Sequence, residues 1–496
     1  MRKHLLSIGV LCFLLILVSS SGAAELDEYA FERYVSSLLR SIDVTNPGNI
    51  YHMQQALMFP VKGAFELHFE RSQHLIAQGL GAALDHTKTL ADLREKGLAG
   101  RIMLDAALTD PSRSGPGRRR IFPLEEAAPG LVPVSGPDAS HRIVKEVPLI
   151  QLQFCYLISF AMKKASISVS QDKPSPELQR FVQKSFEFLL HDVVLPYWRT
   201  CEAPSWAARH KNMKERCLAL VYPIRDPALQ QKSFYKAVLD ADLFFFAIAA
   251  DLNYVLNTHS AVLQGVTIAE QDREVLGEIR ELTVKVVRQR LEPRGFLFQI
   301  GVWSDHPDFL YGGYEGEEYP TSPRPDLKIS EDSSHSHRWP WWLESYRDSW
   351  PASHEHHRYY QTLLERLASQ FIEKVAAFPD ERRVLLTNYM NGENGWYRVG
   401  YSGRAWGFGP YTQTSTALGF SWTILARYDD RIRRYNRILC SVIHSTDPDI
   451  IAFRTKFFGD RTAGNPHKNG WRDKDILGEA SVYSLYCRIG ERLGLY

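Results

Sequence analysis

The stretch EDSSHSHRWPWWLESYRDSW, residues 331–350, places a polar group directly before a strongly aromatic segment. Pro340 suits the first turn of a helix, and the aromatic residues after it recur at helical spacing. The polar residues should therefore lie on a loop that leads into a helix. Imidazole exchanges protons near neutral pH, guanidinium binds carboxylates, and indole rings pack on the apolar faces of sugars. The pattern favours an acidic polysaccharide as ligand, and its structural alternative is a polar helix start before core tryptophans.

Long segments on both sides of this stretch carry helical periodicity. Residues 232–256 are an example, because Phe234, Val238, Phe245 and Ile248 form a wide apolar stripe. Strands and helices do not alternate, which disfavours a doubly wound sheet or a TIM barrel. We expect an all-α fold of paired antiparallel helices. The helices are expected at residues 26–42, 53–84, 147–169, 177–195, 232–256, 269–291, 359–378, 412–426, 431–444 and 477–493.

Two loop segments carry a resemblance to a known group of proteins. DSSHSHRW at residues 332–339 and NYMNGENGWYRVGY at residues 388–401, together with the helix pairs, resemble in general character the exported α/α-toroid polysaccharide lyases and related glycoside hydrolases, of which alginate lyases are one example. The resemblance covers most of the chain but not the β-sandwich that several of those families append. It implies a toroid or incomplete barrel of paired antiparallel helices, with long aromatic and glycine-rich loops gathered at one end.

The N-terminal residues have the build of a secretory signal peptide. Residues 1–24 begin with basic residues, continue as an apolar run and end in small residues, so we expect a periplasmic or secreted protein. A retained membrane anchor is the alternative; no later apolar run is long enough to span a bilayer. Prolines and glycines between residues 108 and 147 indicate a long loop, either a lid or a linker. The expected organisation is a signal peptide (1–24), an N-terminal helical segment (25–107), this loop (108–147) and the main body (148–496).

The net charge narrows the class of partner. Lys and Arg total 59 against 57 for Asp and Glu, a net charge of +2, so no global field favours nucleic acid. The expected partner is an acidic or neutral polysaccharide.

Loss of Cys12 with the signal peptide would leave five cysteines, an odd number, so at least one thiol is unpaired within the chain. Cys201 and Cys217 could form a disulfide, but so few cysteines are no disulfide framework.

Two further segments supply residue types for chemistry, namely residues 295–314 and residues 388–413. β-Elimination of a uronate needs a group that neutralises the carboxylate, a base for the C5 proton and an acid for the glycosidic oxygen. We assign proton transfer or carboxylate contact to His335, acid or base to Tyr401, the carboxylate to Arg404 and a polar contact to Asn388. The residues expected to bind substrate are Trp303, Asp305, His306, Asp332, Arg338, Trp339, Trp396, Tyr397 and Trp406.

Three alternatives remain open. A glycoside hydrolase would use paired carboxyl groups, such as Asp305 and Asp332 with Glu315, Glu317 or Glu344. A binding protein or secretion scaffold would use the same aromatic residues without chemistry. His354, His356 and His357 lack the spacing of a helical zinc motif, so a polar helix start is favoured over a metal site. No P-loop, dinucleotide fingerprint or nucleophile elbow appears, and we expect neither a metal nor a cofactor.

Overall fold

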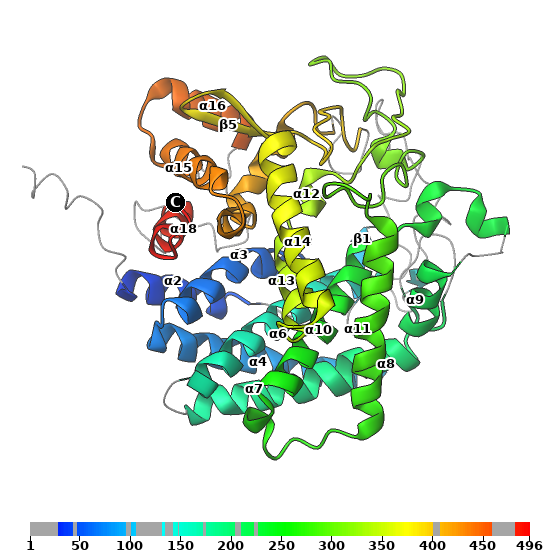
Figure 1. The fold of residues 1–496 in the computed structure, drawn as a ribbon, viewed down its shortest axis with the longest axis vertical. Coiled ribbons are helices and arrows are strands. Elements are labelled where there is room, and N and C mark those ends of the chain that lie inside the picture. The colour runs from blue at the N-terminus through cyan, green and yellow to red at the C-terminus, as the bar shows by residue number, and fades with distance from the viewer. Residues whose placement is uncertain are drawn as a thin grey trace, which may run out of the picture.

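The computed structural model describes residues 28–42, 47–95, 101–105, 131–133, 142–146, 148–171, 175–203, 210–222, 227–399, 407–458 and 482–496. These residues are predominantly helical (Figure 1), which confirms the expected helical class. The α-helices are α2 (Glu28–Arg40), α3 (Pro47–Glu66), α4 (Glu70–Glu95), α6 (Pro148–Gln171), α7 (Pro176–Phe188), α8 (Leu195–Arg199), α9 (Met213–Val221), α10 (Asp240–Thr258), α11 (Glu270–Arg290), α12 (Ser333–Ser336), α13 (Trp339–Asp348), α14 (Glu355–Gln370), α15 (Arg431–His444), α16 (Pro448–Phe458) and α18 (Val482–Arg492).

Two small antiparallel sheets accompany the helices. One has the strand order β1 (Arg101–Asp105), β3 (Arg142–Glu146), β2 (Leu131–Pro133), and the other pairs β4 (Ala376–Asp380) with β5 (Arg383–Leu386). Neither sheet was expected from the sequence. Two of the strands of the first sheet fall within residues 108–147, whose other residues lie outside the described part.

Four expected helices are divided in the structure. Residues 232–256 form the 3₁₀ helix η6 (Ser233–Lys236) and then α10, separated by extended backbone at Ala237 and Leu239. The segment 53–84 is split between α3 and α4, with His68 at φ +55° between them. The segment 359–378 leaves α14 through a π-helical turn and enters β4, because Pro379 disfavours helical backbone before it. The segment 412–426 forms two 3₁₀ helices, η10 (Thr412–Gly419) and η11 (Trp422–Arg427), interrupted by Phe420 at φ +55°. The spacing of apolar residues alone does not predict where a helix is interrupted.

The helices α3, α6, α10 and α13 pack in succession and run parallel to one another. Between α3 and α6, the amides of Gln54 and Gln153 are 2.8 Å apart near the helix starts, and Glu66 and Lys164 pair at 2.6 Å further on. The contacts between α6 and α10 also show a parallel course. Tyr156 packs on Phe244 near the starts of the two helices, and Ser170 contacts His259 at their ends.

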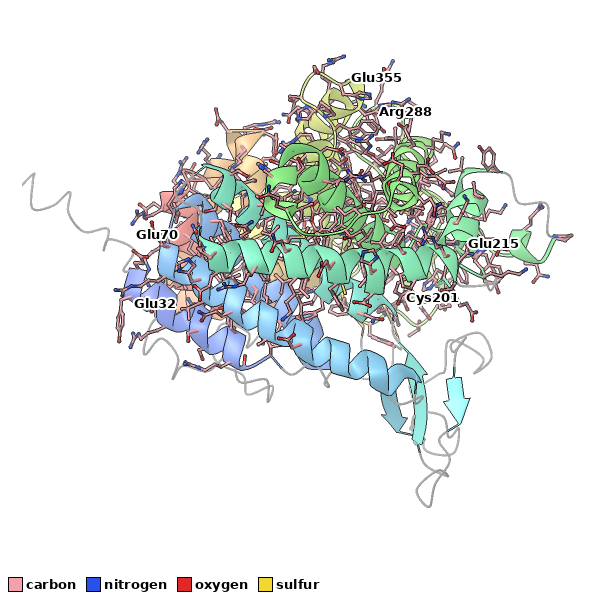
Figure 2. The ribbon with its side chains drawn as sticks, turned by 90° about the horizontal axis from the view of Figure 1, so that it is seen from below. Glu32, Glu70, Cys201, Glu215, Arg288 and Glu355 are labelled. Carbon is pink, nitrogen blue, oxygen red and sulfur yellow. A yellow bond between two sulfur atoms is a disulfide. The ribbon has the colours of Figure 1, made fainter. Side chains whose placement is uncertain are left out.

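The starts of α10 and α13 are joined by the ion pair of Asp240 with Arg338. Further along the same pair of helices, the Tyr346 hydroxyl donates to the Leu243 carbonyl at 2.8 Å. The helices α7, α11 and α14 pack against α6, α10 and α13, respectively, each following its partner in the chain. Figure 2 shows α4 and α7 lying side by side on one face, where Cys201 marks the chain just after α8.

Buried ion pairs join the parallel helices. Lys62 on α3 is fully buried and contacts Glu66 at 2.8 Å and Glu344 on α13 at 3.5 Å. Lys163 on α6 contacts Asp251 on α10 at 3.0 Å and Asp348 on α13 at 3.3 Å. Burial lowers the pKa of Lys62 to about 8, although Glu344 and Glu66 oppose that shift. Since a buried charge without its partner is costly, these pairs restrict how the helices can pack.

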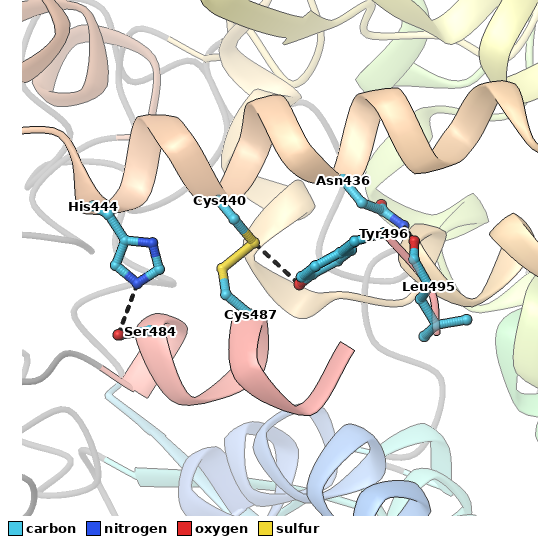
Figure 3. The surroundings of a disulfide bond; sticks show 7 residues. All are labelled: Asn436, Cys440, His444, Ser484, Cys487, Leu495 and Tyr496. Atoms are coloured by element: carbon cyan, nitrogen blue, oxygen red, sulfur yellow. Dashed lines mark hydrogen bonds between the residues drawn. A yellow bond between two sulfur atoms is a disulfide. The ribbon is translucent and has the colours of Figure 1, made fainter. Parts of the chain in front are cut away.

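The last helix, α18, is tied to the body by a disulfide between Cys440 on α15 and Cys487 (Figure 3). The Tyr496 hydroxyl lies 3.0 Å from the Cys440 sulfur, and α18 also packs on α3, where the Tyr486 hydroxyl donates to the Ala56 carbonyl at 2.6 Å. The pairing considered for Cys201 and Cys217 is wrong, because both are free thiols. Sequence could not distinguish these pairs, since the distance between cysteines in space depends on helix packing.

Within the described residues, no helix has both the length and the apolar character needed to cross a bilayer. His354 is the N-cap of α14, and its Nδ1 accepts the His356 N–H at 3.1 Å. The expected polar helix start at these histidines is therefore confirmed. The same described part of the chain holds no group of three or more His, Cys, Asp or Glu residues arranged for a metal ion.

Candidate functional site

Two loops meet at the N-terminal side of α13 and build the candidate site. We call residues 291–332, between α11 and α12, the 300s loop, and the described residues 387–399 and 407–411, after β5, the 390s loop. Main-chain hydrogen bonds join them: the N–H of Arg398 donates to the Asp308 carbonyl at 2.9 Å, and the N–H of Trp396 donates to the Tyr314 carbonyl at 3.1 Å. An isolated β-bridge pairs Asp332 with Tyr389. The two loops therefore act as one structural unit.

Gly395 lies where the two loops approach most closely. A Cβ atom at this position would stand 1.7 Å from the carbonyl oxygen of Gly312, which belongs to the backbone and cannot swing away. Only glycine permits this contact.

Gly395→Ala is therefore expected to separate the loops and to lower any turnover at this candidate site at least about tenfold, because displacements near 1 Å of reacting groups have such effects. Gly277→Ala on α11 is the matched control, since nothing lies within 4 Å of a Cβ there. The measurement is turnover alongside the unfolding temperature of each variant. Equal activity in both variants would contradict this view of the loop contact.

Asp332 and His335 form a hydrogen-bonded dyad at the start of α12. Asp332 is the N-cap, and its Oδ1 accepts the backbone N–H groups of Ser334 at 3.0 Å and His335 at 3.1 Å. Its Oδ2 lies 2.7 Å from Nδ1 of His335. The Asp332 side chain is 2% exposed and that of His335 is 30% exposed. The buried carboxylate thus orients the imidazole, and His335 is the solvent-accessible member of the pair.

The two members of the dyad stabilise each other's charged forms. Burial lowers the pKa of His335, but the carboxylates of Asp332 and Asp240 outweigh it and raise the pKa above its ordinary value. Burial also raises the pKa of Asp332, yet His335 and the hydrogen bonds to this carboxylate lower it overall. When His335 releases a proton, an Nδ1–H held by Asp332 leaves Nε2 as the basic nitrogen. This is the arrangement of a general base oriented by a carboxylate.

Tyr397 and Arg398 lie beside the dyad. The ring of Tyr397 meets the imidazole of His335 edge to face, with centroids 6.4 Å apart. The guanidinium carbon of Arg398 is 5.0 Å from the centre of the same phenol ring, and its Nε donates to Oδ2 of Asp308 at 3.0 Å. Burial raises the pKa of Tyr397 well above its ordinary value, so its hydroxyl keeps its proton at neutral pH. An imidazole, a phenol and a guanidinium are therefore neighbours.

An aromatic cluster extends from Tyr397 into the 300s loop. Phe309 packs edge to face on Tyr397 at 5.2 Å and stacks with Trp303 at 5.6 Å. His306 contacts both Trp303 and Phe309 through its ring, and its Nδ1 accepts the Asp308 N–H at 3.2 Å. Burial lowers the pKa of His306 to about 3, with further effects from Arg398 and His335. His306 is thus neutral near pH 7 and acts here as a packing and hydrogen-bonding group.

The structure brings five of the sequence-predicted residues into this group, namely His335, Asp332, Tyr397, Trp303 and His306. Asp305 lies at the same loop, where Oδ2 accepts the Ser233 N–H at 2.9 Å. Tyr401, Arg404 and Trp406 lie outside the described residues.

Four other predicted residues have structural contacts. Asn388 is fully buried, and its side-chain amide donates to the carbonyls of Gly395 and Gly409 at 2.9 Å each, so it shapes the 390s loop. Trp339 is buried in the core, where its Nε1 donates to Glu331 at 3.1 Å. Arg338 pairs with Asp240, and the Nε1 of Trp396 donates to the Gly316 carbonyl at 2.7 Å.

Asp308 and Arg398 lie in the two loop segments that the sequence marked, but the sequence analysis assigned a role to neither of them, nor to Glu331. Asp308 and Arg398 are 90 positions apart, and their pairing depends on the loop contact, which no local pattern reports. Glu331 lies directly before Asp332, and its carboxylate accepts hydrogen bonds from Trp339 and from Gln299 at 2.9 Å. Burial raises the pKa of Glu331 to about 7. An acidic residue at the start of a segment rich in histidine and tryptophan was the available signal.

The geometry offers a carboxylate-oriented imidazole on α12 and, beside it, a protonated phenol and a cation on the 390s loop. Comparisons with protein-family models, with curated proteins and with solved structures find no match to this chain.

Proposed function

We propose that the protein is an exported polysaccharide-processing enzyme that cleaves a uronate-containing polymer by β-elimination. The observation that carries this proposal is the partly exposed His335, held by the buried Asp332 and bordered by Tyr397 and Arg398. These neighbouring groups are of the types that the reaction requires.

In the proposed reaction, the basic nitrogen of His335 takes the proton from C5 of the uronate. The C5–H electron pair forms the C4–C5 double bond as the bond from C4 to the glycosidic oxygen breaks, and that oxygen receives a proton. A cation near the carboxylate stabilises the charge that develops after proton removal. Arg398 contacts the ring of Tyr397 and is the described cation proposed for this role. Tyr397 is buried and keeps its proton, so it supports the two groups, and the acid that protonates the leaving oxygen stays the predicted role of Tyr401. Tyr401 and Arg404 stay as predicted contributors.

We further propose an α/α toroid as the architecture. The parallel course of α3, α6, α10 and α13 supports it, because an inner ring of helices with outer return helices runs in this way. Contacts continue from α13 through η11, α15 and α18 back to α3, as a closed ring requires. In such a ring, the loops that lead into the inner helices all lie at the same end. The dyad lies at that end, because it directly precedes α13.

Export is supported by the signal-like residues 1–24 and by the disulfide between Cys440 and Cys487. Disulfides persist in oxidising compartments such as the periplasm and are rare in the cytosol.

A glycoside hydrolase is the second candidate, because Asp308 and Asp332 have pKa values that move in opposite directions. Burial raises the pKa of Asp308 despite Arg398, whereas His335 lowers that of Asp332 despite burial. Such divergence is typical of an acid and its carboxylate partner in glycosidases. Asp332, however, already binds His335 and two backbone N–H groups, which favours an orienting role over attack on a sugar.

The test is incubation of the purified protein with a panel of acidic and neutral polysaccharides. Elimination produces an unsaturated uronate that absorbs in the ultraviolet together with new reducing ends. Hydrolysis produces reducing ends alone. Binding without either product would favour the non-catalytic alternative and contradict both enzymatic proposals.

A further inference from the structure

We propose that Arg398 determines specificity for the carboxylate of the substrate and that Asp308 is the positioning residue that holds it. This inference rests on the proposed function, since it names the group that recognises an acidic sugar at the same site. It assigns the carboxylate contact to Arg398, whereas the sequence analysis assigned that contact to Arg404.

Asp308 holds Arg398 at two points. The Asp308 carbonyl accepts the backbone N–H of Arg398 at 2.9 Å, and its carboxylate accepts the Nε–H at 3.0 Å. Between these two contacts, the backbone of Arg398 adopts φ +55°, a conformation that side-chain-bearing residues rarely occupy. Strained backbone of this kind persists where surrounding contacts impose it, and it clusters at functional sites. The pairing therefore fixes the direction in which the arginine leaves the loop.

The pair is asymmetric in exposure. The Asp308 side chain is 7% exposed and that of Arg398 is 27% exposed, so the carboxylate lies inside the loop and the guanidinium extends toward the surface. Guanidinium is planar and matches a carboxylate with two parallel N–H donors, which an ammonium group cannot do. An arginine held through Nε by a buried aspartate is thus oriented for an incoming carboxylate.

Arg398 also lies near the dyad. Its guanidinium and the imidazole of His335 both contact the Tyr397 ring, at 5.0 and 6.4 Å from its centre. The positive charge of Arg398 lowers the pKa of His335, in opposition to Asp332. In a uronate, the carboxylate is attached to C5, the same carbon that loses the proton. We therefore assign these two contacts to a cation and a base that share one phenol ring as neighbour.

The test measures binding separately from turnover. In a His335→Ala background, calorimetry compares a polyuronate with the same polymer after reduction of its carboxyl groups. Arg398→Gln is expected to weaken polyuronate binding roughly 10- to 100-fold, the range for a lost charged hydrogen bond, and to leave the reduced polymer unaffected. Arg398→Lys should recover only part of the loss. Arg437→Gln, at an exposed position on α15, is the matched control and should bind as the parent does.

Asp308→Asn should weaken polyuronate binding less than Arg398→Gln does. The double variant should bind no more weakly than Arg398→Gln alone, because a positioning residue acts through its partner. Additive losses would overturn the role of Asp308, and equal losses for both polymers would overturn the role of Arg398. The wild type could yield no unsaturated product while the His335→Ala parent still binds polyuronate in a way that depends on Arg398. That result would contradict β-elimination and leave this inference standing. Absence of polyuronate binding would overturn it.

Discussion

His335→Ala is expected to lower kcat by about 10²-fold or more, because general acid-base groups contribute rate factors of this size. It should also lower the unfolding temperature, because the buried Asp332 carboxylate loses its charged partner. The side chain is 30% exposed and serves as the accessible member of the dyad, so its removal leaves no large cavity in the core. His191→Ala, at an exposed position between α7 and α8, is the matched control and should turn over as the wild type does.

The pH dependence gives an independent reading of the same dyad. A general base acts in its neutral form, so kcat/KM should rise with pH through the pKa of His335, which Asp332 raises above its ordinary value. Asp332→Asn removes that charge, and the rising limb should move to lower pH while the plateau rate falls. A limb that stays in place in Asp332→Asn, or a His335→Ala variant as active as its control, would show that another group takes the proton.

Removal of the disulfide is expected to have the largest effect on stability. Cys440 and Cys487 are separated by 47 positions, and closing a loop of this length stabilises a protein by about 4 kcal/mol in the chain-entropy model. The Cys440→Ser/Cys487→Ser double variant should therefore lose about that much free energy of unfolding. Unfolding of the variant should begin at α18, because the disulfide maintains the contacts of this helix with α15 and α3.

Urea titration under non-reducing conditions measures this change, and hydrogen exchange locates it. Cys201→Ser is the matched control, because Cys201 is a free thiol at a partly exposed position. Reducing agent should lower the stability of the wild type toward that of the double variant and leave the double variant unaffected. Similar unfolding free energies for the double variant and the control would mean that packing alone retains α18.

The sequence by itself determined the helical class and much of the location of the helices. Residues 431–444 were predicted as a helix and form α15 with the same bounds, because an amphipathic pattern records burial along one helix face. Neighbours in the chain were also predictable. Asp332 and His335 are three residues apart, and one turn brings them within hydrogen-bond distance. Tyr397 joins them from a segment that its aromatic and glycine content had already marked.

Only the tertiary structure decided which distant residues meet. Lys62 and Glu344 are 282 positions apart, Asp308 and Arg398 are 90 apart, and Cys440 was paired with Cys487 instead of Cys201 with Cys217. Asn388 and Trp339, chosen for their chemistry, are buried in structural contacts. Residue type and spacing describe what a side chain can do within a turn or two. Its burial and its partners depend on how the helices and loops pack, and that packing is a property of the whole chain.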